Sequence, residues 1–324
     1  MFSSPRHYSP IFSIQESLQV SSCSMPPAAI VQLLKPCFST TVFRASLLIV
    51  AVVWFLVKAS SIAGQIERMV PAPTSFVIPR VLIIIQTSPE LVPTRVKDIR
   101  ETWGKRVHAK PSMKLIFATT DQKYASDDMW SSGCSDGYFQ AICKLGYSLE
   151  RAFKLMKEDQ FDWLFFGDDD IYVLPDNLQH LILELGPEAA SSRSVFGVPG
   201  CADKDCVGFC GGAGFLLSRT ALEAIIEGSP TSVDAELQGL SRKCGDYHDV
   251  VFGHLIERDR NMTMLAYPQN PYVWGFDSLT EYFDSFSNRK TLSWLYHYPS
   301  RDKMRWLHHM VGTYGTNLEI ADAR

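Results

Sequence analysis

Apolar segments of strand length alternate along this chain with amphipathic segments of helical length. The runs RVLIIIQT (80–87), KLIFATT (114–120) and DWLFFG (162–167) each have the length of a buried strand. Between them, TRVKDIRETWGKR carries Val96, Ile99 and Trp103 at helical spacing, and Leu145 and Leu149 mark the face of a second helix. Strands that alternate with helices in this way form largely parallel sheets with helices on both faces, so we predict an α/β fold.

The same alternation continues towards the C-terminus. Pro175 suits the first turn of a helix, VFGV (195–198) and GAGFLLS (212–218) read as strands, and RTALEAIIEG reads as a helix that ends at Gly228. The chain has 324 residues and a formal net charge of -4, with no run of basic residues. We therefore expect no nucleic-acid partner.

The N-terminal region carries one apolar segment, Ala45 to Val57, which lies between Arg44 and Lys58. A span of the hydrocarbon layer needs about 20 residues, so a spanning helix would continue to about Gly64. We predict a disordered cytoplasmic tail (1–44), a single-pass signal anchor (45–64), a short stem (65–79) and a luminal domain (80–324). A buried helix and a wrongly assigned N-terminus are the competing interpretations, and the long tail disfavours a cleaved signal peptide.

Cysteine usage supports a luminal C-terminal domain. Six of the eight cysteines follow the apolar segment, an even number that suits three disulfides. Asn261-Met262-Thr263 is a glycosylation sequon on the same side. A zinc site at CADKDCVGFC plus Cys244 is the less favoured alternative, because no paired CxxC accompanies it.

Three consecutive aspartates, Asp168, Asp169 and Asp170, follow the apolar run WLFFG directly. Adjacent carboxylates repel one another, so near a buried strand they need protons or a cation. Ligands of α/β sheets bind beyond the carboxyl ends of strands, and aspartates are suited to Mg²⁺ or Mn²⁺ together with phosphates. The triplet therefore predicts a site for a metal and a diphosphate, although a solvated turn is an equally simple reading of an acidic triplet alone.

Three motifs together resemble one enzyme family. FFGDDDIYVLPDNL, CGGAGFLLSRTAL and RVKDIRETWGKR resemble the Fringe-like β1,3-glycosyltransferases, including the core 1 galactosyltransferases, over about residues 80–309. The resemblance implies a GT-A fold, Mn²⁺, a UDP-sugar donor, a glycan or glycoprotein acceptor and a Golgi or ER membrane location. A homodimer is one expected assembly.

The resemblance also implies roles for individual residues. They are Asp249 as catalytic base, Asp170 with Asp168 and a late histidine as metal ligands, and Arg95, Asp169, Gly211 and Gly212 as donor contacts. Each has a plainer reading: Arg95 as a surface arginine, Asp249 as a helix cap, and the glycines as a tight turn.

The metal-binding histidine that the resemblance implies is best matched by His297. His308 and His309 are alternatives, because the gap between Asp249 and His297 is longer than in Fringe. The resemblance further implies a Cys134–Cys143 disulfide. We expect Cys201–Cys206 and Cys210–Cys244 for the rest, although connectivity cannot be read from one sequence.

The predicted reaction is a single displacement with inversion, in which Asp249 deprotonates an acceptor hydroxyl that attacks the anomeric carbon of a UDP-sugar. Two other classes remain open: a non-catalytic Golgi glycan-binding or chaperone-like protein on the same fold, and a soluble metal-dependent phosphohydrolase. The motifs do not determine whether the donor carries galactose, N-acetylglucosamine or another sugar.

Overall fold

The computed structural model describes residues 54, 78–135, 140–268, 295–297 and 301–314. The chain divides into two units, Met1–Phe76 and Val77–Arg324, and the second contains all the described residues except Trp54. The predicted tail, the predicted anchor (apart from Trp54) and most of the predicted stem lie outside the described residues. Within the described part of the chain, no helix combines the length and the apolar character needed to cross a membrane.

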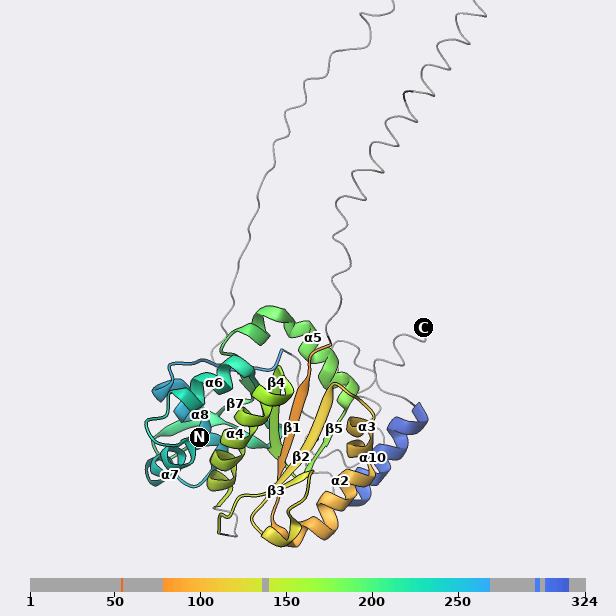
Figure 1. Cartoon of the computed structure of the whole chain (residues 1–324), viewed down its shortest axis with the longest axis horizontal. Coiled ribbons are helices and arrows are strands. Elements are labelled where there is room, and N and C mark those ends of the chain that lie inside the picture. The colour runs from red at the N-terminus through yellow and green to blue at the C-terminus, as the bar shows by residue number, and fades with distance from the viewer. Residues whose placement is uncertain (1–53, 55–77, 136–139, 269–294, 298–300, 315–324) are drawn as a thin grey trace, which may run out of the picture. The chain divides into compact units, whose positions relative to one another are not determined.

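A seven-stranded sheet in the order β10-β6-β9-β4-β1-β2-β3 forms the centre of this unit (Figure 1). β1 pairs in parallel with β2 and β4, β2 with β3, and β6 with β10, whereas β9 runs antiparallel to both of its neighbours. The bounds of its strands are β1 Val81–Gln86, β2 Met113–Thr119, β3 Met129–Ser131, β4 Trp163–Asp168, β6 Val195–Gly197, β9 Phe215–Ser218 and β10 Met264–Ala266.

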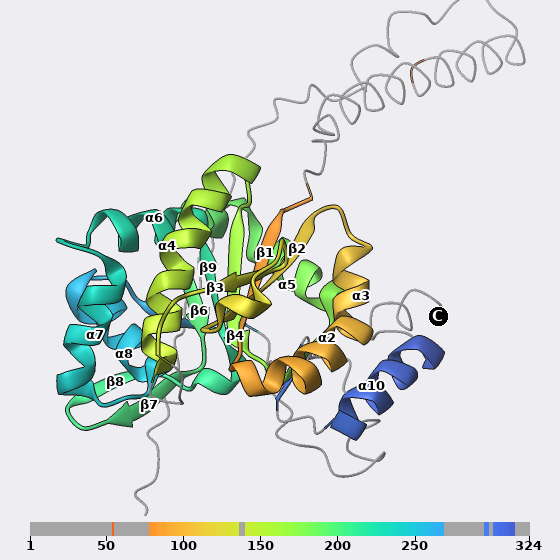
Figure 2. The same cartoon turned by 60° about the horizontal axis from the view of Figure 1, so that its bottom comes forward.

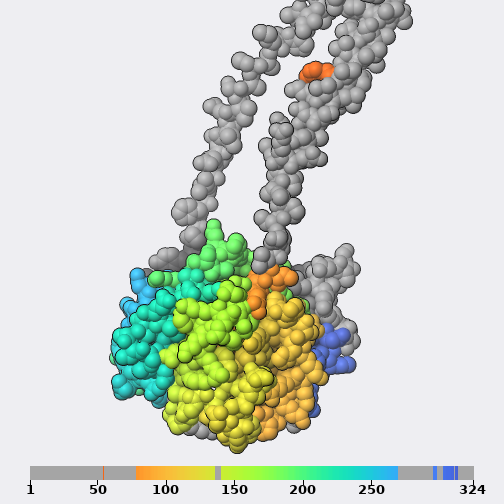
Figure 3. All heavy atoms as spheres, viewed as in Figure 1, coloured from red at the N-terminus to blue at the C-terminus, as the bar shows by residue number. Residues whose placement is uncertain are grey.

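Helices cover both faces of the sheet (Figure 2). One face is covered by α2, α3, α5 and α10, and the other by α4, α6, α7 and α8. In the space-filling view, the orange and yellow segments up to β3 and the cyan segments of α6 and α7 occupy opposite sides of the visible face (Figure 3). The bounds are α2 Lys97–Glu101, α3 Trp103–His108, α4 Ala141–Asp159, α5 Pro175–Ser191, α6 Arg219–Glu227, α7 Val233–Cys244, α8 His248–His254 and α10 Arg301–Tyr314.

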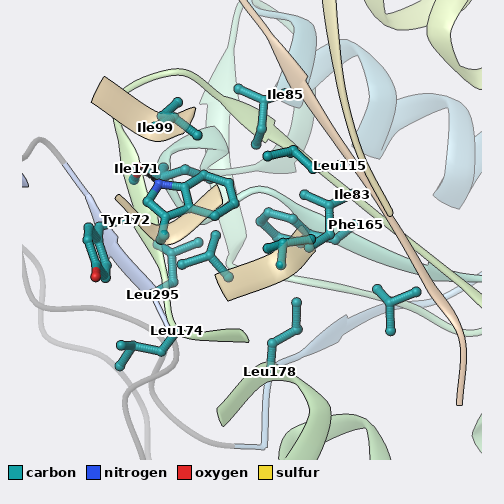
Figure 4. Packing of buried hydrophobic residues seen from close by; sticks show 14 of the residues in the cluster. Ile83, Ile85, Ile99, Leu115, Phe165, Ile171, Tyr172, Leu174, Leu178 and Leu295 are labelled. Atoms are coloured by element: carbon teal, nitrogen blue, oxygen red, sulfur yellow. Dashed lines mark hydrogen bonds between the residues drawn. The ribbon is translucent and has the colours of Figure 1, made fainter. Parts of the chain in front are cut away.

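Strand β1 explains why the core has two halves. Successive side chains of a strand point to opposite faces, so Ile83 and Ile85 enter one cluster, while Leu82 and Ile84 enter the other. Figure 4 shows the first cluster, where Ile83 and Ile85 lie with Ile99 and other apolar side chains of the neighbouring elements. The continuous apolar run of β1 is thus buried on both sides, which confirms the predicted α/β fold with a mostly parallel sheet.

The helix predicted after β1 is interrupted. A π-helical turn (Val92–Val96) leads into α2, and Thr102 leaves helical geometry at φ -115° and ψ -111° before α3 begins. The Thr102 hydroxyl donates to the Asp98 carbonyl at 2.6 Å, which satisfies a carbonyl that the break would otherwise leave without an amide partner. A Cβ on Gly104 would lie 2.7 Å from the Ile99 carbonyl oxygen, so glycine permits this close approach.

Two small pairs of strands, which the sequence patterns did not predict, flank the main sheet. β5 (Ile171–Val173) pairs antiparallel with β11 (Leu295–His297), and β7 (Pro199–Asp203) pairs with β8 (Cys206–Phe209) as a hairpin. β5 of the first pair immediately follows the aspartate triplet, and the second pair packs against α8. Both therefore lie where they can position functional residues.

Candidate active site

The aspartate triplet lies at the carboxyl end of β4, which is flanked by β1 and β9 in the middle of the sheet. Asp168 is the last residue of β4, and Asp169 and Asp170 form the turn into β5. The parallel register places Gln86, the last residue of β1, opposite Asp168. The predicted position of the triplet at the end of a strand is confirmed, because β4 ends at Asp168. β1 ends at the same edge of the sheet.

Asp169 is buried and bonded through both of its oxygens. Its Oδ2 accepts a hydrogen bond from the Thr87 hydroxyl at 2.5 Å, and its Oδ1 accepts one from Arg95 Nη1 at 2.6 Å. Burial raises the pKa of Asp169, and these two bonds offset only part of that shift. Asp169 thus ties the end of β1 and the turn after it to the triplet.

Arg95 extends from its π-helical turn to the triplet. Besides its bond to Asp169, its Nη1 lies 3.9 Å from Asp170 Oδ2, and 45% of its side chain is exposed. Burial lowers the pKa of Arg95, but the hydrogen bond from its side chain to Asp169 and the nearby aspartate charges outweigh burial, so the pKa is raised overall. The structure therefore brings this predicted site residue to the aspartates.

Asp170 carries the most perturbed carboxyl group of the triplet. Burial, followed by the charges of Asp168 and Asp169, raises its pKa to about 7. Its buried Oδ1 accepts no hydrogen bond within the described part of the chain and lies 3.6 Å from Nε2 of His297. A buried carboxylate beside two other carboxylates is stabilised when it binds a proton or a cation.

His297 reaches Asp170 because β11 pairs with β5. The antiparallel register sets His297 opposite Ile171, the residue after Asp170, and the histidine is only 4% exposed. Burial lowers the pKa of His297 to about 4, despite the opposing charge of Asp168, so the ring is neutral at neutral pH. Of the three candidate histidines, this one adjoins the triplet. His308, on α10, places its Nδ1 3.3 Å from the Tyr172 hydroxyl, and His309 is exposed.

These groups fit a hard divalent cation. A buried carboxylate oxygen without a hydrogen bond and a neutral imidazole nitrogen lie side by side on Asp170 and His297, and oxygen with imidazole nitrogen is a donor set that Mn²⁺ accepts. Asp168 is differently placed: its Oδ1 accepts a short hydrogen bond from Gln86 Nε2 and lies 3.8 Å from His248 Nε2.

Gly211 and Gly212 form a 3₁₀ turn (Gly211–Ala213) that separates His297 from Asp249. A Cβ on Gly212 would lie under 3.0 Å from the His297 ring, and one on Gly211 would lie 2.9 Å from Asp249 Oδ2. The Gly211 amide donates to Asp249 Oδ2 at 2.6 Å. The glycines thus permit two close contacts.

Asp249 is the second residue of α8 and is half-buried. Tyr247 is the N-cap and makes no side-chain cap bond, while the Asp249 carboxylate accepts from Gly211. The carboxylate also lies in the first turn of the helix, where the backbone dipole favours the ionised form. Its arrangement therefore differs from that of an N-cap aspartate.

A cavity of about 240 Å³ opens beside the triplet. Several residues of its wall were not predicted from the sequence. Gln86 and Thr87 end the first predicted strand, and the rule that ligands bind at carboxyl ends of strands would have indicated them. Lys144, whose Nζ donates to the Thr87 carbonyl at 3.1 Å, and His248 gave no such signal. The lining residues are Gln86, Thr87, Ser88, Glu90, Leu91, Arg95, Ala141, Lys144, Asp168, Asp169, Asp170 and His248.

The disulfides differ in part from the expected pairing. Cys134–Cys143 is confirmed, but the others are Cys201–Cys210 and Cys206–Cys244. The expected Cys201–Cys206 bond is wrong because the β7–β8 hairpin pairs Asp203, not Cys201, with Cys206. Cys206 is buried in the core with Cys244 at the end of α7. These four sulfurs are therefore not free thiolates for zinc.

No protein-family model matches the chain. Over 157 residues the chain is 29% identical to glycoprotein-N-acetylgalactosamine 3-beta-galactosyltransferase 1 of Xenopus laevis, a match that covers 48% of this chain and 40% of that protein. The chain thus matches less than half the length of this relative. The resemblance inferred from the motifs is confirmed as distant homology.

Solved structures with a similar fold include three glycosyltransferases. One is involved in glycosylation of the major capsid of PBCV-1 (12% identity, 72% of this chain, 100% of that chain, TM-score 0.44). The second is the galactosyltransferase LgtC in complex with donor and acceptor sugar analogs (9% identity, 70% and 95% covered, TM-score 0.36). The third is a mannosyltransferase from Pyrobaculum calidifontis in complex with GDP-Man and Mn²⁺ (11% identity, 53% and 55% covered, TM-score 0.31).

Proposed function

We propose that residues 80–324 form the GT-A-type catalytic unit of an inverting, metal-dependent glycosyltransferase. It would move a hexose or N-acetylhexosamine from a UDP-sugar to a hydroxyl of a glycan or glycoprotein, in β1,3 linkage. The observation that supports this most is the contact of Asp170 with His297 at the end of β4, 3.6 Å apart and beside a cavity lined by the triplet. Distant homology to a β-galactosyltransferase supports the same reaction class.

Asp170 and His297 are the proposed metal ligands, with Asp168 as the third protein ligand. When bound there, Mn²⁺ would supply positive charge that stabilises the diphosphate leaving group. For Asp168 to join, its carboxylate must keep one oxygen available while the other accepts from Gln86. His297 suits the role because burial keeps its ring neutral and able to donate a lone pair.

Asp249 is the proposed general base. Its carboxylate would accept the proton of the acceptor hydroxyl as that oxygen forms a bond to the anomeric carbon of the donor. The bond from that carbon to the UDP oxygen breaks at the same time, UDP departs with the electron pair, and the configuration inverts. The Gly211 amide holds the Asp249 carboxylate in one orientation through Oδ2, which leaves Oδ1 to receive the proton.

The remaining predicted residues are proposed donor contacts. Arg95, with nearly half of its side chain exposed at the cavity, is placed to pair with donor phosphate. Asp169 would act mainly by orienting Arg95, since both of its oxygens are already bonded. Gly211 and Gly212 would contact the donor through backbone groups, because the positions of their missing side chains are already occupied by Asp249 and His297.

We further propose a Golgi or ER location, with residues 1–44 cytoplasmic, 45–64 as the anchor and 65–79 as the stem. Three disulfides and an exposed Asn261 in the sequon support a luminal domain, because disulfides persist in oxidising compartments. Cell fractionation with a protease-protection assay would test this topology. Cleavage of the domain from outside intact vesicles would contradict it.

The decisive experiment for the reaction is UDP release by the purified full chain. UDP-galactose, UDP-N-acetylglucosamine, UDP-glucose and UDP-glucuronate would be supplied in turn, with Mn²⁺ and with chelator. Slow transfer to water removes the need to know the acceptor. We expect Mn²⁺-dependent release from one donor, which names the sugar. Failure both to release UDP and to bind UDP with Mn²⁺ would instead favour a non-catalytic glycan-binding protein.

A further inference from the structure

We propose that His248 is a positioning residue: through Gln86 it holds the start of α8, and with it Asp249, against the carboxyl ends of β1 and β4. This inference rests on the proposed function. In this inference, Gln86 and His248 link the aspartate triplet, where the donor would bind, to Asp249, the proposed base. Three sets of contacts hold this part of the site together.

The first set is the amide of Gln86. This residue is 4% exposed, and its Nε2 donates to Asp168 Oδ1 and lies 3.1 Å from His248 Nε2. A rotated amide would turn its oxygen towards the Asp168 carboxylate, which is repulsive, so the NH₂ group must face the carboxylate. Because the amide then donates to both neighbours, His248 Nε2 is the acceptor and the histidine proton lies on Nδ1.

The second set fixes the imidazole ring. Only 13% of the His248 side chain is exposed, and its ring lies edge-on to Phe166 and Phe215, at centroid distances of 6.4 and 6.2 Å. These two phenylalanines stack on each other across β4 and β9. The ring therefore cannot turn away from Gln86 without losing its packing against the sheet.

The third set of contacts fixes Asp249, the residue after His248. Asp249 accepts from the Gly211 amide at 2.6 Å, so adjacent residues of α8 are anchored to different parts of the fold. The helix has only seven residues, and its N-cap residue Tyr247 adds no side-chain bond. Together with the packing of the helix backbone against Gly208, where a Cβ would lie 2.8 Å from the Asp249 carbonyl oxygen, these two side-chain contacts fix the start of α8.

Loss of the His248 contact should therefore displace Asp249 and slow turnover, while the metal ligands and Arg95 remain in place. A displacement of about 1 Å of a catalytic group is enough to lower a rate by up to about 10²-fold. Donor affinity should change little. This pattern separates a positioning role from direct donor binding, which would raise the Kd for UDP.

Two substitutions test the role. His248→Phe keeps a ring against the edge of the two stacked phenylalanines but removes the acceptor nitrogen, whereas His248→Gln restores a polar group near the position of Nε2. His180→Phe on α5 is the matched control, since His180 pairs only with Glu184 in the described structure and lies outside the cavity wall. The readouts are kcat for UDP release, the Kd for UDP with Mn²⁺, and hydrogen exchange of residues 211 and 247–252.

We expect His248→Phe to lower kcat at least about tenfold, to leave the Kd within about twofold, and to speed exchange of the Gly211 amide. His248→Gln should recover most of the rate, and His180→Phe should behave as the wild type. A raised Kd with unchanged kcat, or unchanged exchange in His248→Phe, would overturn the proposal. If the wild type neither releases UDP from any donor nor binds UDP with Mn²⁺, the proposed function fails, while the exchange measurement still decides the positioning role.

Discussion

At the scale of single residues, substitutions of Asp249 and Asp170 are expected to impair different functions: proton transfer for Asp249 and metal binding for Asp170. Asp249→Asn should lower transfer by about 10²-fold or more, because an amide cannot accept the acceptor proton. Binding of UDP with Mn²⁺ should persist, since the carboxylate bonds to Gly211 and not to the triplet. Steady-state kinetics with calorimetry of UDP binding check both parts.

The matched control for Asp249→Asn is Asp246→Asn, which changes an exposed aspartate three residues earlier. Retention of most activity in Asp249→Asn together with its loss in Asp246→Asn would assign the base to Asp246.

The pH dependence of metal binding follows from Asp170. Burial and its two neighbouring carboxylates raise its pKa to about 7, so the metal-free fold gains stability from protonation of Asp170. That contribution is fully present below the ordinary pKa of about 4 and is lost as pH rises through about 7. A metal needs the carboxylate, so Mn²⁺ affinity should fall as pH falls below about 7.

Thermal melting with and without Mn²⁺ measures this effect. The rise in Tm caused by Mn²⁺ should be larger at about pH 8 than at about pH 5.5, and Asp170→Asn should abolish it at the higher pH. His297, with its pKa lowered to about 4, stays neutral at both values and does not contribute to the difference. An equal rise at the two pH values would remove Asp170 from the ligand set.

At the scale of elements, the turn Gly211–Ala213 acts as a spacer between β11 and α8. Gly212→Ala should weaken Mn²⁺ binding, because the new Cβ would overlap the buried His297 ring and the ring would have to move. Titration of Mn²⁺ by calorimetry checks the effect. Wild-type affinity in Gly212→Ala would show that His297 is not a ligand.

Gly239→Ala in α7 controls for the loss of a glycine as such. The nearest atom to a Cβ there is 3.8 Å away, and Gly239 lies within a helix. This substitution should therefore stabilise the fold by about 0.5–1 kcal/mol and leave Mn²⁺ binding unchanged.

At the scale of the whole unit, two disulfides join the β7–β8 hairpin to the segments that lead to Gly211 and to Asp249. Cys201–Cys210 joins β7 to the residue before Gly211, and Cys206–Cys244 joins β8 to the end of α7. The second closes a loop of sequence separation 38 and the first one of 9. Chain-entropy estimates give contributions of roughly 4 and roughly 2.5 kcal/mol to stability.

Replacing each cysteine pair with serine should therefore lower the unfolding free energy more for Cys206–Cys244 than for Cys201–Cys210. Chemical denaturation of the two variants measures the difference. The reverse order would mean that strain or residual denatured-state structure outweighs loop entropy here.

The sequence by itself determined the features that depend on near neighbours along the chain. The alternation of apolar runs with helical spacing gave the α/β class, and DWLFFGDDD set the triplet at a strand end. RTALEAIIEG predicted α6, which ends before Gly228 as expected. Backbone periodicity and turn chemistry act over a few residues, so one sequence suffices to read them.

Only the tertiary structure decided which distant residues meet. The pairing of β11 with β5 selects His297 over His308 and His309 as the histidine beside Asp170. The hairpin register set the disulfides, and the parallel register of β1 and β4 joined Gln86 to Asp168. A shift of one residue in strand register exchanges the two faces, and no local pattern in these short strands fixes that register.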